Sequence, residues 1–450
     1  MKTRMNFKDE FYQKLKLLVL PIAIQNFMLA LVSATDAIML GWIDQTSLSA
    51  VSLAGQVQFV LSLFISGIAA GAGIMAAQYW GKQDAASIEK VIPIALRTNL
   101  LFSGLFTILA GFCPEMLMRI FTNDAPLVAS GSQYLRAVAL SYVLCGISQV
   151  YLILLKNTGH AAVSSRISST AVVLNIILNA ILIYGLCGAP ALGIRGAAYA
   201  TVAARVVELI WAYLETKKPE RVRILWNRLF SSAGKILSED FWRYTLPVLA
   251  ASLVWGIAYV LYSVIMGHMG SDAVAANSIT SIAKSLLSCL IRGVSGGAGV
   301  LIGNLLGADE LEKAREYGGR LTHLAIAIGV VTGGLLMLIS PAIVHFAPLT
   351  DTAAEYLQYM LLFCGLNLMA QSVNTTVLDG IFCAGGDAKF DMQGNIGAMW
   401  CFSVPLGFLA AFWLKLPVMV VYCIVNLDEI EKLPAVYLHY KKYVWVRNIT

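Results

Sequence analysis

The sequence predicts an all-α polytopic membrane protein, with twelve transmembrane helices arranged as two pseudo-symmetric six-helix lobes. Composition, recurring apolar runs and an internal repeat lead to this prediction. Of the 450 residues, 58% are hydrophobic and only 13% are charged, whereas a soluble globular chain carries about 25% charged residues. Apolar runs of about 20 residues, long enough to cross a bilayer as helices, recur from one end of the chain to the other.

The apolar runs define twelve expected spans. In chain order they are residues 17–42, 47–79, 91–114, 127–156, 162–187, 192–216, 240–266, 273–305, 316–345, 352–384, 391–414 and 416–440. The first residues, MKTRMNFKDEFYQKLK, are basic and amphipathic, and no small-residue cleavage site follows them. We therefore expect an uncleaved first helix and not a signal peptide.

Lysines and arginines are distributed unevenly over the connections between the spans. One set of connections and span ends holds 24 of the 32 Lys and Arg residues, and the opposite set holds three, Arg119, Arg195 and Lys415. The positive-inside rule then places both termini in the cytoplasm. The net charge of +6 reflects this topology. We expect a multi-pass monomer in the lipid bilayer of the cell membrane, and no nucleic-acid partner.

An internal repeat divides the chain. With an offset of 226 residues, the Leu-Pro pair at 20–21 meets the Leu-Pro pair at 246–247, and GIAAGAG at 67–73 meets GVSGGAG at 293–299. We predict an N-terminal lobe, 1–216, a cytoplasmic linker, 217–239, and a C-terminal lobe, 240–450. Each lobe has an even number of spans, so the two repeats are parallel, an arrangement that suits alternating access to a cavity between them.

Several stretches together resemble the multidrug and toxic compound extrusion (MATE) family of transporters. They are LPIAIQNFMLALVSATDAIMLG, GIAAGAGIMAAQYWGKQD, LNIILNAILIYG, LGIRGAAYATV, the second-half copies and the terminal WVRNIT. The resemblance covers nearly the whole chain in the family's order. It implies two six-helix lobes and export of organic, often cationic, compounds in exchange for protons or sodium ions.

Asp36 is the only ionisable side chain between Leu17 and Trp42, and such a residue inside a membrane span is a functional candidate by default. At 1.5 Å per residue, Asp36 lies roughly 9 Å, Asn179 roughly 12 Å and Thr201 roughly 13 Å from the outer ends of their spans. Asn175 lies one turn below Asn179 on the same helix face. We expect these four residues to meet in the outer half of the first lobe.

One carboxylate with amide and hydroxyl oxygens suits Na⁺, a hard cation that takes oxygen ligands by analogy with calcium, and it can equally bind a proton. The resemblance implies the same site, because Asp36 resembles the family's span-1 aspartate, and Asn175 and Thr201 resemble its amide and hydroxyl partners. Asn179 departs from the pattern, since some relatives carry an aspartate there. For the two asparagines and the threonine, hydrogen bonding between packed helices is an equally good interpretation.

The second lobe departs from the family's NorM-like branch. Trp255 stands at the place of that branch's span-7 glutamate, and Tyr262 is the repeat partner of Asp36. Asp379 in span 10 is an acid, but its alignment stays open. We therefore expect no NorM-like cation site in this lobe, and closer similarity to the DinF-like branch.

Further polar residues are candidates for the cavity. Gln58 and Lys284 are repeat equivalents, and we expect both to face the central cavity, with Trp255, Tyr262 and Asp379 as further candidates for substrate contact. Lys284 either repels cationic compounds or pairs with Asp379. Arg205 and Glu208, at i and i+3, are expected to pair. The acids of NLDEIEK, at 426–432, are expected to form a solvated helix face.

These features predict a cation-coupled (H⁺ or Na⁺) antiporter that exports drugs or toxic organic compounds by alternating access, with Asp36 as the coupling carboxylate and no cofactor. The expected substrates are small, cationic or amphipathic. A lipid-linked oligosaccharide flippase of related architecture is the alternative, which twelve spans and the Asp36 site disfavour. The sequence has no HExxH or GxSxG motif and no paired catalytic acids, so a membrane-embedded enzyme is not expected.

Overall fold

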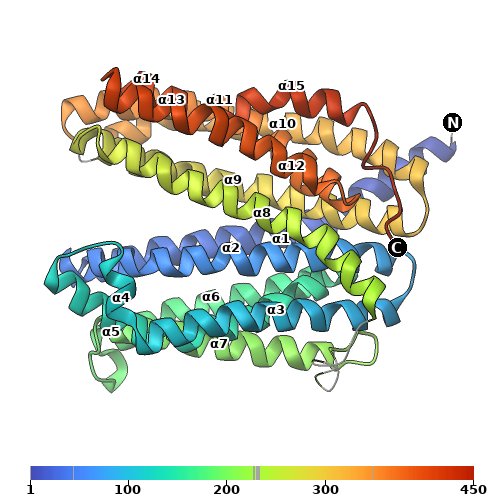
Figure 1. The fold of residues 1–450 in the computed structure, drawn as a ribbon, viewed down its shortest axis with the longest axis horizontal. Helices are drawn as coiled ribbons and strands as arrows, with labels where there is room; N and C mark the ends of the chain where they lie inside the picture. The colour runs from blue at the N-terminus through green and yellow to red at the C-terminus, as the bar shows by residue number, and fades with distance from the viewer. Residues whose placement is uncertain (1, 44, 225, 227–228, 230–233, 348) are drawn as a thin grey trace. The chain divides into compact units, whose positions relative to one another are not determined.

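The computed structural model describes residues 2–43, 45–224, 226, 229, 234–347 and 349–450. Within these residues every regular element is helical (Figure 1). Most helix bounds agree with the expected spans to within a few residues. The main exception is the first helix, which begins at Lys2 because the amphipathic start of the chain continues the apolar helix without a break.

The helices of the first half end before residue 217. They are α1 (Lys2–Gly41), α2 (Gln45–Gly81), α3 (Ala85–Phe112), α4 (Pro114–Arg119), α5 (Ala125–Leu155), η1 (Lys156–His160), α6 (Ala161–Tyr184), η2 (Leu186–Gly188) and α7 (Ile194–Thr216). The short helix α4 was not expected.

The helices of the second half begin at residue 235. They are α8 (Lys235–Gly267), α9 (Ser271–Gly307), α10 (Leu311–Phe346), α11 (Asp351–Thr375), η4 (Thr376–Phe382), α12 (Ala388–Asn395), η5 (Ile396–Ser403), α13 (Val404–Phe408), η6 (Leu409–Trp413), α14 (Val418–Val425) and α15 (Asp428–Tyr440). The segments η4, η5 and η6 are π-helical turns inside longer helices.

Ten helical stretches of the described residues are long and apolar enough to cross a membrane. One of them, Ala125–Tyr184, is 60 residues long and contains a break at Gly159, where φ is +80°, so it makes two spans. The last expected span is divided at Asn426 and Leu427 into α14 and α15, and neither piece is long enough by itself. Both breaks together account for twelve spans, and the all-α polytopic fold class is confirmed.

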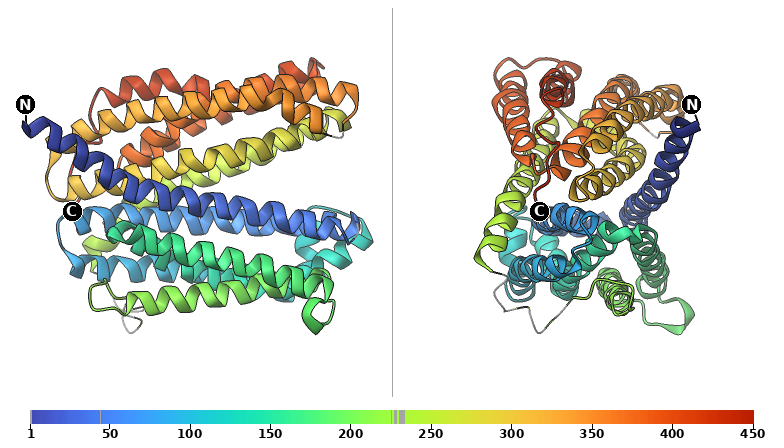
Figure 2. Two further views of the ribbon diagram at one scale, coloured as in Figure 1. Left: turned by 180° about the vertical axis from the view of Figure 1, so that it is seen from behind. Right: turned by 90° about the vertical axis from the view of Figure 1, so that its right-hand side faces the viewer.

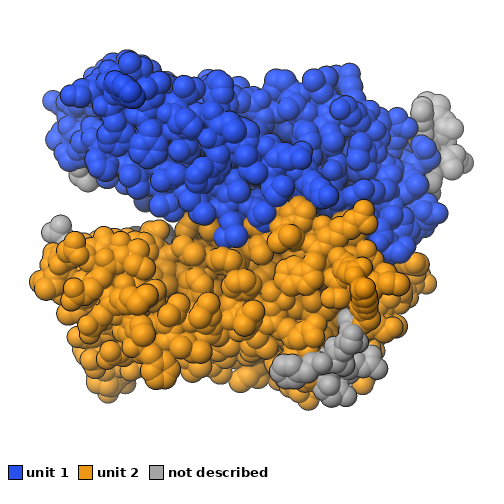
Figure 3. Space-filling model, in the orientation of Figure 1, with its two compact units in different colours: residues 1–26, 250–450 blue, residues 27–249 orange. Residues whose placement is uncertain are grey.

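The chain forms two compact units (Figure 3). Unit 1 consists of residues 1–26 and 250–450, and unit 2 consists of residues 27–249. Both borders fall inside a long helix, α1 or α8. The lobes 1–216 and 240–450 follow the sequence repeat instead, and their bounds stay a prediction. Within the expected linker, 217–239, residues 225, 227–228 and 230–233 lie outside the described residues.

Glycines of the repeat explain where these borders fall. In unit 2, a Cβ on Gly67 of α2 would lie 2.9 Å from the Cα of Leu249 in α8. In unit 1, a Cβ on Gly293 of α9 would lie 2.9 Å from the Cα of Ala23 in α1. Both members of one pair are 226 residues from those of the other, so the repeat reproduces the contact. Only glycine lets the helix backbones approach this closely.

Each unit has its own hydrophobic core. In unit 2, helices α2, α3, α5, α6 and α7 pack on one another and lie side by side (Figure 2), around buried side chains such as Leu61, Val138 and Tyr142. In unit 1, α9, α10 and α11 pack together, and the beginning of α1 joins them through Phe11, whose ring centroid is 4.8 Å from that of Tyr317. The helices of unit 2 position the site described next.

Candidate functional site

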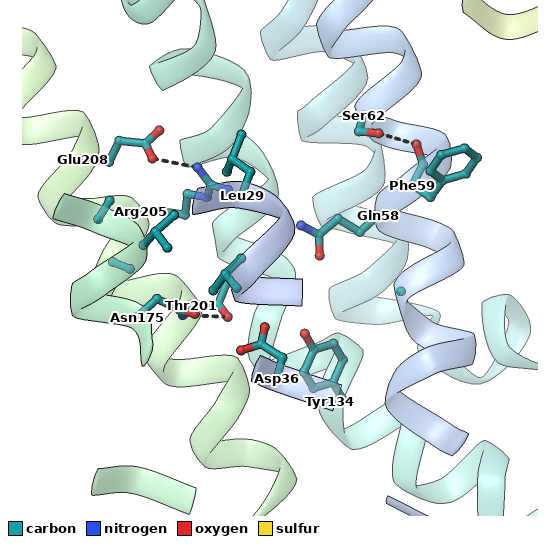
Figure 4. Close-up of a pocket in the computed structure, with 15 residues that line it drawn as sticks. Leu29, Asp36, Gln58, Phe59, Ser62, Tyr134, Asn175, Thr201, Arg205 and Glu208 are labelled. Atoms are coloured by element: carbon teal, nitrogen blue, oxygen red, sulfur yellow. Dashed lines mark hydrogen bonds and ion pairs between the residues drawn. The ribbon is translucent and has the colours of Figure 1, made fainter. Parts of the chain in front are cut away.

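A cavity of about 340 Å³ lies inside unit 2, with Asp36 on its wall (Figure 4). Its lining comes from α1, α2, α5, α6 and α7. The polar side chains of this lining are Asp36, Gln58, Ser62, Tyr134, Asn175, Thr201, Arg205 and Glu208. The cavity therefore gathers polar groups from five helices at one place in a largely apolar unit.

The four residues expected to meet are joined by a chain of hydrogen bonds. Asn179 Nδ2 donates to Asp36 Oδ1 at 2.5 Å and to Asn175 Oδ1 at 3.4 Å. Asn175 Nδ2 in turn donates to Thr201 Oγ1 at 3.3 Å. The structure thus connects the carboxylate of α1 through the two amides of α6 to the hydroxyl of α7.

Helix geometry explains this chain. Asn175 and Asn179 are one turn apart, so they share one face of α6, and they are 6% and 0% exposed. The Thr201 hydroxyl donates to the backbone oxygen of Ala197 at 3.0 Å, which leaves its oxygen as an acceptor. Depth along the helices, counted from the sequence, was sufficient to bring these residues together.

Asn179 also carries a buried oxygen without a partner. Its Oδ1 atom has no hydrogen bond to any described residue, although the side chain is fully buried. A buried acceptor in this state costs free energy. The site beside Asp36 therefore has one oxygen that a cation or a proton donor can satisfy.

A second polar group of the cavity was expected only as an ion pair. Arg205 Nη1 lies 2.7 Å from Glu208 Oε2, which confirms the pair, and Ser148 Oγ donates to Glu208 Oε1 at 2.6 Å. Its place in the same cavity as Thr201 was not foreseen. The signal was present, because positions 201, 204, 205 and 208 lie on one face of α7 and all line the cavity.

Two other cavity residues come from α2 and α5. Gln58 lines the cavity, as expected. Tyr134, which the sequence analysis did not select, lies beside Asp36 in Figure 4 and is 8% exposed. An aromatic residue in a membrane helix is usually a packing residue, so the sequence contained no signal that singled out Tyr134.

The remaining candidates belong to unit 1 and do not line this cavity. Lys284 Nζ donates to Asn367 Oδ1 at 2.8 Å, so among the described residues its hydrogen-bond partner is an amide and not Asp379. The Trp255 ring stacks on Tyr259, with centroids 5.6 Å apart. Tyr262 is 8% exposed and lies in the hydrophobic core, whereas Asp379 is exposed.

One interpretation from the sequence was wrong. The charged residues of α15 do not form a solvated face, because Asp428, Glu429 and Lys432 are 6%, 9% and 5% exposed. The neighbouring helix α11 covers them. The segment is rich in charge, and its burial depends on neighbours that the local sequence does not reveal.

A family model described as MatE matches residues 21–181 and 247–409, together more than half of the chain. The chain belongs to the MatE family. The two matched segments begin 226 residues apart, at the offset of the internal repeat. As a MatE protein, the chain is a multi-pass membrane transporter and not an enzyme, and the family's multidrug transport implies small organic substrates.

Curated relatives match this MatE protein over most of their length. "Probable multidrug resistance protein YoeA" of Bacillus subtilis is 21% identical, over 99% of this chain and 96% of the relative. "Uncharacterized transporter YisQ" of the same organism is 20% identical, over 95% and 94%. "Probable multidrug resistance protein NorM" of Agrobacterium fabrum is 25% identical, over 85% and 83%.

Solved structures share the fold of this MatE protein. A MOP superfamily transporter from Pyrococcus furiosus, described with a binding pocket of reverse polarity, superposes with a TM-score of 0.86 at 19% identity, covering 96% of this chain and 95% of its own. A multidrug resistance MATE transporter in an outward-facing conformation superposes with a TM-score of 0.82 at 18% identity, with the same coverage. The expected closeness to the DinF-like branch stays a prediction.

Proposed function

We propose that this MatE protein is a cation-coupled antiporter, in which H⁺ or Na⁺ binds at Asp36 and drives the export of small organic compounds. The observation that carries the proposal is the hydrogen bond between Asp36 and Asn179 on the wall of the unit 2 cavity. It holds the only acid between Leu17 and Trp42 against a buried amide whose oxygen has no partner among the described residues.

The oxygen atoms around Asp36 support a monovalent ion. Asp36, Asn175, Asn179 and Thr201 offer carboxylate, amide and hydroxyl oxygens, which suit Na⁺ by analogy with calcium, and the carboxylate alone suffices for a proton. No group of three or more His, Cys, Asp or Glu among the described residues is arranged to hold a metal ion. A single carboxylate matches the charge of one monovalent cation.

The cavity supports a small organic substrate. Its volume of about 340 Å³ is at the lower end of the range of about 300–1,000 Å³ for ligand pockets. Asp36 and Glu208 carry two negative charges and Arg205 one positive charge, which leaves one formal negative charge in favour of a cationic or amphipathic compound. The relatives named for multidrug resistance support drugs or toxic metabolites and do not favour a lipid-linked oligosaccharide flippase.

Exchange follows if the ion and the substrate depend on the same carboxylate. A proton or Na⁺ at Asp36 removes the negative charge that attracts an organic cation, so ion entry favours substrate release. Alternating access then requires that each ligand prefer a different conformation of the protein. We place the protein in the cell membrane as a monomer, with both termini in the cytoplasm.

Transport into vesicles tests this proposal. The purified protein is reconstituted in lipid vesicles, H⁺ and Na⁺ gradients are imposed separately, and the movement of ethidium is followed by fluorescence. We expect one gradient to drive transport, Asp36→Asn to abolish it, and Asp351→Asn, at an exposed position of α11, to leave it unchanged. Full-rate transport by Asp36→Asn contradicts the site, and transport driven by neither gradient contradicts the antiporter.

A further inference from the structure

Unit 1 contains a second group of charges, which the Asp36 site does not use. Asp391 of α12 and Asp428, Glu429 and Lys432 of α15 are all less than 10% exposed. Asp379 of η4 lies within electrostatic range of this group and is its exposed member. The group is formed by helices α12 and α15 and the π-helical turn η4, which are far apart in the sequence.

Lys432 is the cation at the centre of this group. Its Nζ lies 3.4 Å from Asp428 Oδ2 and 3.8 Å from Glu429 Oε1. Glu429 Oε2 also accepts a hydrogen bond from Asn374 Nδ2 at 2.8 Å. Asp391 has no ion pair at contact distance among the described residues, and its Oδ1 accepts from Asn395 Nδ2 at 3.1 Å.

The charges of the group do not balance. Its carboxylates are Asp379, Asp391, Asp428, Glu429 and Glu431. The cations within electrostatic range are Lys432 and, from α9, Lys284 and Arg292. Five acids against three bases leave two formal negative charges in a helical membrane unit, where unpaired buried charge is very unfavourable. Two uncharged groups that titrate only in alkaline solution, Tyr262 and Cys383, also face the acids.

Two buried oxygen atoms mark where the missing positive charge belongs. Asn374 is 2% exposed and donates through Nδ2 to Glu429, yet its Oδ1 has no hydrogen bond to any described residue. Glu431 Oε1 is buried and likewise lacks a partner there. Acceptors without donors beside several carboxylates are the arrangement that bound protons would complete.

We propose that this group, centred on Asp391 and Lys432, is a proton-binding site of unit 1, separate from the Asp36 site. Lys432 is the fixed counter-ion of Asp428 and Glu429, and bound protons supply the remaining positive charge. A metal ion fits less well, because no three of these acids, among the described residues, are arranged to hold one. Asp379, as the exposed member, is the point at which a proton enters or leaves.

Infrared difference spectroscopy tests the site without measuring transport. Full-length protein in lipid vesicles is compared in mildly acid and mildly alkaline buffer, and the carbonyl band of protonated carboxylic acids is integrated. All variants carry Asp36→Asn, so the Asp36 site contributes nothing. We expect the band to persist in this background and Asp391→Asn to remove one carboxylic acid group per molecule, whereas Asp351→Asn does not change it.

Changing Lys432 gives the opposite result. Lys432→Met removes one positive charge, so we expect one more protonated carboxylic acid group per molecule, and Lys432→Arg should restore the original band. Asp391→Glu, which keeps the acid, shows whether loss of the band reflects chemistry or misfolding. Identical bands with and without Asp391, or an unchanged band in Lys432→Met, overturn the proposal and leave the function proposed for Asp36 intact.

Discussion

Asn179 of α6 donates a hydrogen bond of 2.5 Å to the carboxylate of Asp36 in α1, although the two residues are 143 positions apart in the chain. The same amide reaches Asn175. The carboxylate is therefore held by one buried side chain at the wall of the cavity. Changing that amide tests how much of the ion site depends on the position of the acid.

Asn179→Ala removes a hydrogen bond to a charged group, which is worth about 1.5–3 kcal/mol. We expect the ion concentration for half-maximal transport to rise by roughly 10- to 100-fold, with little change in substrate-independent leak. The measurement is transport rate against ion concentration, corrected for the amount of folded protein. Asn99→Ala is the control, because Asn99 is buried in unit 2 but bonds to Gly146 and does not line the cavity. An equal effect of both substitutions would mean that packing alone is measured.

Glu208 and Arg205 form a buried pair, so removing one partner should be worse than removing both. Glu208→Gln leaves the Arg205 charge without its partner, and we expect the free energy of unfolding to fall by about 3–5 kcal/mol. The double change Glu208→Gln with Arg205→Met should regain much of this loss. Denaturation of the purified protein in detergent measures all three. Losses that simply add would show that the two side chains do not interact.

Gly67 leaves no room for a side chain against α8. In Gly67→Ala the new Cβ would lie 2.9 Å from Leu249 Cα, so helices must move apart, and we expect a loss of about 1–3 kcal/mol in the free energy of unfolding. Gly104→Ala in α3 is the control, since nothing lies within 4 Å of its added Cβ, and alanine should favour the helix there. Thermal unfolding in detergent distinguishes the two. A Gly67→Ala protein as stable as the control would contradict the close contact.

Asp84 begins α3 outside the membrane spans and makes stability depend on pH. Its side chain accepts hydrogen bonds from Ser87 Oγ at 2.6 Å and Ser87 N at 3.0 Å, and these bonds, the hydroxyl foremost, hold the pKa of Asp84 below its usual range. A lowered pKa in the folded state stabilises the fold above the unfolded pKa of about 3.9, and the stabilisation is lost as the pH falls through the folded value.

Asp84→Ala should therefore lower the free energy of unfolding by about 0.5–2 kcal/mol at neutral pH. The difference from the unchanged protein should disappear in acid. Asp124→Ala is the matched control, because Asp124 precedes α5 without a side-chain capping bond. Denaturation at several pH values gives the comparison, and a difference that persists in acid would rule out the carboxylate as its source.

The sequence was sufficient to predict most of the fold and part of the candidate site. Long apolar runs gave the spans, and depth along the helices brought Asp36, Asn179 and Thr201 to one level. The burial of Lys432 and Glu429 was missed, because a charged segment has the same local pattern in water and beneath another helix. The cavity position of Arg205 depends on how α7 faces its neighbours, which local spacing suggests only once another residue of that face is known.

The borders of the two units have a consequence for how the protein is made. A cut in the expected linker, 217–239, yields two fragments, each of which contains the first part of a helix that belongs to the other fragment's unit: residues 1–26 for one and residues up to 249 for the other. Neither fragment can complete its own core alone. The two halves are in effect domain-swapped within one chain, so they must mature together, and a ribosome that has finished the first half has not yet supplied all of either unit.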